Sequence, residues 1–211
     1  MNSVPSNGGM DMKRGILIFI MLFGILAFTS CSKEEIFITT EDVAFNTMLV
    51  KRDGSIYVAI VEDFDKSHYN LSELNEFVSK EVKAYNDEVG SDEVSLESLE
   101  IKNDKAVMII RYSKMAHYSA FNNIQVAYFS ADTDNVDLDL PAQYINAKKE
   151  TLVSKEDAFK SKKDQVLVVY EPFDIILEGK VRFYSENATY IEENKIHSAS
   201  EDMTVVIYKP M

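Results

Sequence analysis

The chain has 211 residues, 46% of them apolar and 27% charged, which suits one domain with a packed core and a charged surface. Its 22 Lys and Arg stand against 35 Asp and Glu, giving a formal net charge of −13. Nucleic-acid binding requires a basic face that neutralises phosphates, so this balance argues against it. The single Cys excludes an internal disulfide and any zinc site built from several cysteines.

The N-terminal region has the order of a bacterial export signal. Lys13 and Arg14 form a short basic stretch, residues 15–28 are apolar, and small residues follow. A membrane-spanning helix needs about 20 apolar residues, so an uncleaved transmembrane anchor is the weaker alternative for this shorter run. We therefore predict a lipoprotein signal peptide over residues 1–30. Because the first eleven residues do not resemble a signal peptide, a translation start at Met12 is the alternative to Met1.

Cys31 lies where the signal would be cleaved. Phe28-Thr29-Ser30-Cys31 resembles a lipobox, at which bacterial lipoprotein precursors are lipidated on Cys and cut just before it; Phe28 replaces the usual aliphatic residue. A free buried Cys is the alternative, but a thiol at the end of a signal peptide has no core to enter. Two or more acyl chains attach a protein stably, since each buried CH₂ contributes about 0.8 kcal/mol. We expect lipidated Cys31 to anchor the protein on the extracytoplasmic face of the cell membrane.

Residues 31–43 are expected to form a short charged tether, and residues 44–211 a single extracytoplasmic domain. The domain opens with two apolar runs, 46–50 and 55–61, which flank Asp53-Gly54. Asp-Gly between such runs predicts a hairpin with a type I′ turn, because both residues tolerate a positive φ.

A long helix is predicted after this hairpin. Asn70 and Glu73 form a capping box at its start, and Gly90 ends it. The apolar residues at helical spacing, expected on one face, are Leu71, Leu74, Phe77, Val78, Val82, Tyr85 and Val89.

The remainder of the domain predicts further hairpins and two short helices. Ser113 is expected to cap a helix reaching Asn123, and Ser154 a helix over 155–161. Two hairpins are predicted: strands 96–102 and 105–112 around Asn103-Asp104, and strands 174–177 and 180–185 around Glu178-Gly179. Further strands are predicted over 124–130, 165–170, 189–191, 195–198 and 203–209. Because strands and helices do not alternate regularly, we predict an α+β fold: an antiparallel sheet built from hairpins, with one main amphipathic helix and two short helices.

No catalytic motif stands out in the sequence, which lacks a nucleophile elbow, a P-loop and a dinucleotide fingerprint. The three histidines, His68, His117 and His197, have no second His or carboxylate at an obvious metal spacing. Capping or solvent-facing roles are their default, and no catalytic residue or cofactor is predicted.

An acidic stretch offers oxygen ligands of the kind that Ca²⁺ prefers: Asp132, Asp134, Asp137 and Asp139. Val136 stands where the EF-hand pattern requires a ligand, and no glycine or distal glutamate falls in register. A solvated acidic turn is therefore favoured over a metal site.

Three stretches carry a family resemblance: FITTEDVAFNTMLVKRDGSIYVAIVEDFDKSHYNLSELNEF, DKAVMIIRYS and VVIYKP. They resemble a group of uncharacterised lipoproteins from Gram-positive gut anaerobes, over most of the mature chain. The resemblance implies attachment to the outer face of the cytoplasmic membrane. It supplies no activity and no functional residue beyond Cys31.

Two classes of function remain open. The favoured one is a non-catalytic interaction or ligand-binding module, whose partners are the membrane, through Cys31, and an unknown envelope protein or polymer. The alternative is an extracytoplasmic hydrolase acting on cell-envelope or nutrient polymers. That alternative requires a concave site that joins one of the three histidines to two acids with perturbed pKa values.

Overall fold

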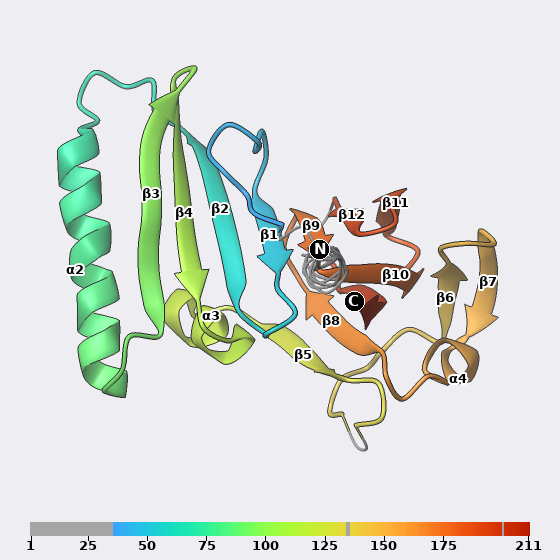
Figure 1. Ribbon diagram of the computed structural model, residues 1–211. Helices are drawn as coiled ribbons and strands as arrows, with labels where there is room; N and C mark the ends of the chain where they lie inside the picture. The colour runs from blue at the N-terminus through green and yellow to red at the C-terminus, as the bar shows by residue number, and fades with distance from the viewer. Residues whose placement is uncertain (1–35, 134–135, 200) are drawn as a thin grey trace, which may run out of the picture. The chain divides into compact units, whose positions relative to one another are not determined.

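A computed structural model describes residues 36–133, 136–199 and 201–211 (Figure 1). The predicted signal peptide, Cys31 and residues 32–35 lie outside these residues. The described chain has a mixed α+β fold, with two sheets of mostly antiparallel strands and three helices. The predicted fold class is therefore confirmed at this level, but one sheet was expected where the chain forms two.

Sheet A contains seven strands, one pair of which is parallel. In spatial order they are β11 (Ala188–Glu192), β12 (Lys195–Ser198), β9 (Phe173–Leu177), β1 (Thr47–Val50), β2 (Ile56–Asp63), β4 (Lys105–Tyr112) and β3 (Val94–Lys102). The parallel neighbours are β1 and β9, while the other neighbours are antiparallel.

Sheet B contains six antiparallel strands. In spatial order they are β5 (Val126–Ser130), β8 (Gln165–Val169), β13 (Thr204–Pro210), β10 (Gly179–Tyr184), β6 (Gln143–Asn146) and β7 (Thr151–Ser154). The central strand predicted over residues 165–170 is present but ends at Val169. Leu167 and Val169 enter a core shared with sheet A, while Val166 and Val168 enter a second core on the opposite face. Apolar residues on both faces are what a strand between two cores requires.

The helices are α2 (Leu71–Val89), α3 (Met115–Asn122) and α4 (Lys155–Ala158). The predicted bounds of the long helix are confirmed. The Asn70 side chain accepts hydrogen bonds from the backbone N–H groups of Ser72 and Glu73, and Gly90 ends the helix with a φ of 77°. Helix α2 lies along β3, at the edge of sheet A (Figure 1).

Two predicted local details of turns and caps are wrong. The type I′ turn occurs at Asn103 and Asp104, with φ values of 49° and 60°, whereas only Gly54 has a positive φ in the β1–β2 loop. The longer β1–β2 loop closes with a hydrogen bond from the Lys51 N–H to the Ser55 carbonyl. Ser113 does not cap α3, because its hydroxyl is bonded to the Glu93 carboxylate.

Other boundaries also differ from expectation. Ser154 caps α4 as predicted, accepting a hydrogen bond from the Asp157 N–H, but the helix ends at Ala158 rather than at 161. The hairpin of β6 and β7 was not predicted.

The predicted hairpin at Glu178-Gly179 is wrong, since β9 belongs to sheet A and β10 to sheet B. The Glu178 N–H donates to the carbonyl of Val50, which continues the parallel pairing with β1. At Gly179 the chain passes close under β13, where a Cβ atom would lie 2.6 Å from the Lys209 carbonyl oxygen. The glycine thus serves a close approach between strands rather than a tight turn.

The expected boundary between tether and domain at residue 44 also needs correction. Ile38 is buried with Leu49, Ala59 and Ile109 on the outer face of sheet A. The carbonyl of Ile36 accepts a hydrogen bond from the Lys51 ammonium at 2.8 Å. Residues 36–43 are therefore part of the folded domain.

Candidate functional site

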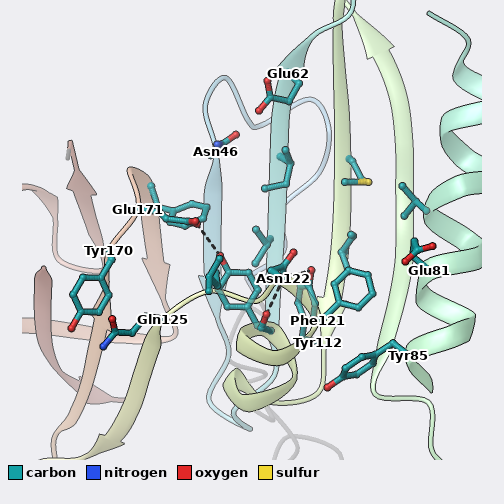
Figure 2. A pocket seen from close by; sticks show the side chains of 18 of the residues that line it. Asn46, Glu62, Glu81, Tyr85, Tyr112, Phe121, Asn122, Gln125, Tyr170 and Glu171 are labelled. Atoms are coloured by element: carbon teal, nitrogen blue, oxygen red, sulfur yellow. Dashed lines mark hydrogen bonds between the residues drawn. The ribbon is translucent and has the colours of Figure 1, made fainter. Parts of the chain in front are cut away.

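The inner face of sheet A, which carries Val58, Ile60, Met108 and Ile110, is only partly covered. Helix α2 packs on β3, and sheet B packs over the strands from β1 to β12. Between these two covers lies a groove of about 1140 Å³, floored by β2 and β4 and closed at one end by α3 (Figure 2).

The floor of the groove is apolar. Val58 and Ile110 are fully buried, whereas Ile60 and Met108 on the same two strands are half-buried and pack against the margin of the core. The alternation of strand side chains places all four on one face of the sheet. A ligand that covered Ile60 and Met108 would remove further apolar surface from water.

Aromatic rings close the α3 end of the groove. The ring centroids of Tyr112 and Tyr118 are 5.1 Å apart, and those of Tyr85 and Phe121 are 5.5 Å apart. Both pairs have the edge-to-face geometry that stabilises aromatic contacts. The Asn122 amide donates to the Tyr112 hydroxyl at 3.1 Å (Figure 2).

These tyrosines stay protonated at physiological pH. Burial raises the pKa of Tyr112 to about 12, against a smaller opposing effect of the Asn122 hydrogen bond. Burial, with the nearby Glu171 carboxylate, also raises the pKa of Tyr118. Tyr118 is therefore a neutral donor, and its hydroxyl lies 3.5 Å from Glu171 Oε2.

Carboxylates stand on both walls of the groove. Glu81 and Glu88 come from α2, Glu62 from the end of β2, and Glu171 and Glu201 from the segments after β8 and β12. Figure 2 shows Glu81 and Glu171 on opposite sides of the floor strands. Among the described lining residues there is no Lys, Arg or His, so the groove combines an apolar floor with walls of one charge.

None of the three histidines lines the groove. His197 Nδ1 lies 2.7 Å from Asp174 Oδ1, in a pair formed between β12 and β9. His68 is exposed and makes an edge contact with the ring of Tyr69.

His117 belongs to a polar cluster between α3 and the loop before β3. Its Nδ1 lies 2.9 Å from the Tyr85 hydroxyl, its Nε2 lies 3.3 Å from Glu93 Oε2, and the same Glu93 oxygen accepts from Ser113. The carboxylate thus stands between the hydroxyl and the imidazole. In a Ser-His-acid triad the imidazole must stand between the other two groups to take the hydroxyl proton, so this arrangement does not activate Ser113.

The acidic stretch considered for calcium is only partly described. Asp132, Asp137 and Asp139 are exposed, and Asp134 lies outside the described residues. Within 36–133, 136–199 and 201–211, no three His, Cys, Asp or Glu side chains gather as metal ligands would.

The predicted lipidation site, Cys31, lies outside the described residues. In the part of the chain that the structure covers, no helix has the length and apolar character needed to cross a membrane.

The chain matches no known family model, no curated protein and no solved structure. The resemblance to lipoproteins of gut anaerobes therefore stays an expectation.

Sequence reasoning did not identify the residues that line the groove. One signal lay within the helix pattern: Phe77 belongs to the apolar set expected on one face of the helix, and in the structure its side chain is 60% exposed. Phe77, Glu81, Ala84 and Glu88 follow one another at helical spacing and form the α2 wall. The apolar face of α2 is wider than the part of the helix that packs on sheet A. The uncovered part of that face forms part of the groove wall.

Proposed function

We propose that this protein is a lipoprotein, anchored through Cys31 on the extracytoplasmic face of the cell membrane, whose domain is a non-catalytic module that binds a ligand in the groove on sheet A. The observation that carries the proposal is the groove itself, with its half-buried apolar floor. Its volume of about 1140 Å³ exceeds the range of about 300–1,000 Å³ common for small-molecule sites. That size favours part of an envelope protein or polymer as the ligand.

In this proposal α2 is the main amphipathic helix of the domain. Val78 and Val82 on one face pack in the core of sheet A, and the adjacent face, with Phe77 and Ala84, forms a wall of the groove. One helix then stabilises the sheet and shapes the binding surface.

The anchor would hold the domain near the membrane. The carbonyl of Ile36, the first described residue, already accepts a hydrogen bond from Lys51, so the stretch between the anchor and the domain would run from Cys31 to Ile36. The five steps along the chain from Cys31 to Ile36 span at most about 18 Å. The partner is accordingly expected at or near the membrane surface.

Labelled palmitate tests the anchor. We expect a bacterial host to incorporate it into the wild-type chain and not into a Cys31→Ser variant. No incorporation, or equal incorporation into both, would contradict the anchor.

Methyl NMR tests the groove. With ¹³C-methyl-labelled methionine, we expect added indole, a small uncharged aromatic, to shift the Met108 resonance saturably. Ala84→Trp places a large ring in the α2 wall and should abolish the shift, whereas Ser79→Trp, exposed on the same helix but away from the groove, should not. A shift that is absent, or identical in both variants, would contradict ligand binding in the groove.

A further inference from the structure

The charge of the groove selects among ligands. All five charged residues that the structure describes in its lining are glutamates, Glu62, Glu81, Glu88, Glu171 and Glu201. The walls therefore attract cations and repel anions, and this effect is strongest where the adjoining surface is apolar and excludes water.

The apolar floor of the groove favours a ligand that has an apolar face as well as positive charge. Ile60 and Met108 are half-buried on the floor, and Phe77 is 60% exposed above it. A simple cation would leave this surface in water. A ligand with an apolar face and flanking cations would satisfy the floor and both walls together.

The dimensions of the groove suit a helix. Adjacent strands are about 4.8 Å apart, and an α-helix with its side chains is about 10 Å wide, so one helix covers about two strands. Helix α2 packs on β3, and the inner face of β2 and β4 stays partly open around Ile60 and Met108, next to the buried Val58 and Ile110. Glu81 and Glu88 are two helical turns apart on α2. Two cationic side chains with the same spacing on a helix lying beside α2 would therefore pair with both carboxylates.

We propose that the groove binds a cationic amphipathic helix of a partner protein or peptide. The apolar face of that helix lies on Ile60 and Met108, and its Lys or Arg side chains meet Glu81 and Glu88 on one wall and Glu171 on the other. This inference rests on the proposed function, because it names the class of ligand for the same groove. Helices with one apolar stripe are commonly recognised in this way.

Designed peptides provide the test. The first is an 18-residue helical peptide with leucines at i, i+3, i+4 and i+7 spacing and lysines elsewhere. The second has glutamates in place of the lysines, and the third has the composition of the first in scrambled order. The full chain is purified from the bacterial host. If it is membrane-bound it is studied in phosphatidylcholine nanodiscs, and if it is not it is studied in buffer. Binding is followed through the Met108 methyl resonance, which reports on the groove rather than on lipid.

A matched pair of variants separates the groove from the general acidity of the chain. Glu81→Gln with Glu88→Gln removes two charges from the α2 wall. Glu76→Gln with Asp87→Asn removes two charges from the same helix at exposed positions that do not line the groove. We expect the first pair to weaken binding of the lysine peptide about three- to tenfold, and the second to change it about twofold or less.

The outcomes are distinct. Support requires that the lysine peptide shift Met108, that the other two peptides bind at least about tenfold more weakly, and that the effect of the first variant pair shrink in high salt. If indole shifts Met108 but the peptides do not differ, or if both variant pairs act alike, the cationic helix is wrong and the binding groove stands. If neither indole nor any peptide shifts Met108, both proposals fail. A wild-type dimer in light scattering that Ala84→Trp dissociates would overturn the inference in favour of a second copy of the chain.

Discussion

Gly179 shows how one residue position can join the two sheets. It stands one residue beyond the end of β9 in sheet A, begins β10 and pairs with Pro210 in sheet B. Its φ is not in the left-handed region, so its role is spatial: a side chain there would meet the ring of Tyr208 and the backbone of Lys209. Both neighbours are held, Tyr208 by burial and Lys209 by strand pairing.

At this scale we predict that Gly179→Ala destabilises the protein by about 1–3 kcal/mol, the usual cost of overpacking. The sign of the change in unfolding free energy tests the clash. An alanine that met no clash would stabilise the protein by about 0.4–1 kcal/mol, because it restricts the conformations of the unfolded chain. Urea unfolding measures the change, with Lys180→Ala, at the exposed next position, as the control expected to stay within about 0.5 kcal/mol. Equal midpoints for the two variants would refute the close approach.

Helix α2 shows how local signals define an element. Asn70 accepts from two backbone N–H groups in the first turn, and Gly90 donates its N–H to the Asn86 carbonyl in a left-handed conformation. These contacts satisfy groups that a helix end leaves without partners. Asn86 also ties the helix end to β3, since its amide donates to the Val94 carbonyl at 2.8 Å.

For this element we predict that Asn70→Ala lowers the free energy of unfolding by about 1 kcal/mol, because the first turn loses its cap. Asn75→Ala, an exposed change of the same type inside the helix, should leave stability unchanged or raise it slightly, since alanine has the higher helix propensity. Thermal unfolding of both variants measures the contrast. The cap would have no stabilising role if the two melted together.

At the scale of the whole molecule, Glu178 connects segments from distant parts of the chain. Its carboxylate lies 2.7 Å from the Lys51 ammonium and accepts the Arg52 N–H at 2.9 Å, and its carbonyl accepts from the N–H of Met211. Burial acts to raise its pKa, but the hydrogen bonds and charge of Lys51, with the Arg52 N–H, hold the pKa below the usual 4.5. The Glu178 carboxylate therefore stabilises the fold only while it is ionised.

The sign of the pH dependence follows from this lowered pKa. The unfolded chain takes up the Glu178 proton at a higher pH than the folded chain, so the stabilisation is complete above about pH 5.5 and is lost as the pH falls through the folded pKa. We predict that Glu178→Gln flattens the fall in unfolding free energy between about pH 5 and pH 3. Urea unfolding at a series of pH values measures this slope, with Glu76→Gln as the control for the loss of one charge. A wild-type slope in Glu178→Gln would contradict the assignment.

Several features that depend on neighbours in the sequence were determined by the sequence alone. The bounds of α2, its caps, and the turn at Asn103-Asp104 follow from local backbone preferences. The buried strand β8 follows from its unbroken apolar run, because such a run must enter a core on both faces.

Only the tertiary structure decided how these elements pair. The apolar run of β9 predicts a strand but not its partners, since hydrogen bonds to β1 and β12 in sheet A compete with those of a local hairpin. The groove has the same origin. Glu81 and Glu171 lie far apart in the sequence but on opposite sides of β2 and β4 in the structure. They come together because α2 packs on β3 and leaves part of the neighbouring strands uncovered, a consequence of packing that no local pattern encodes.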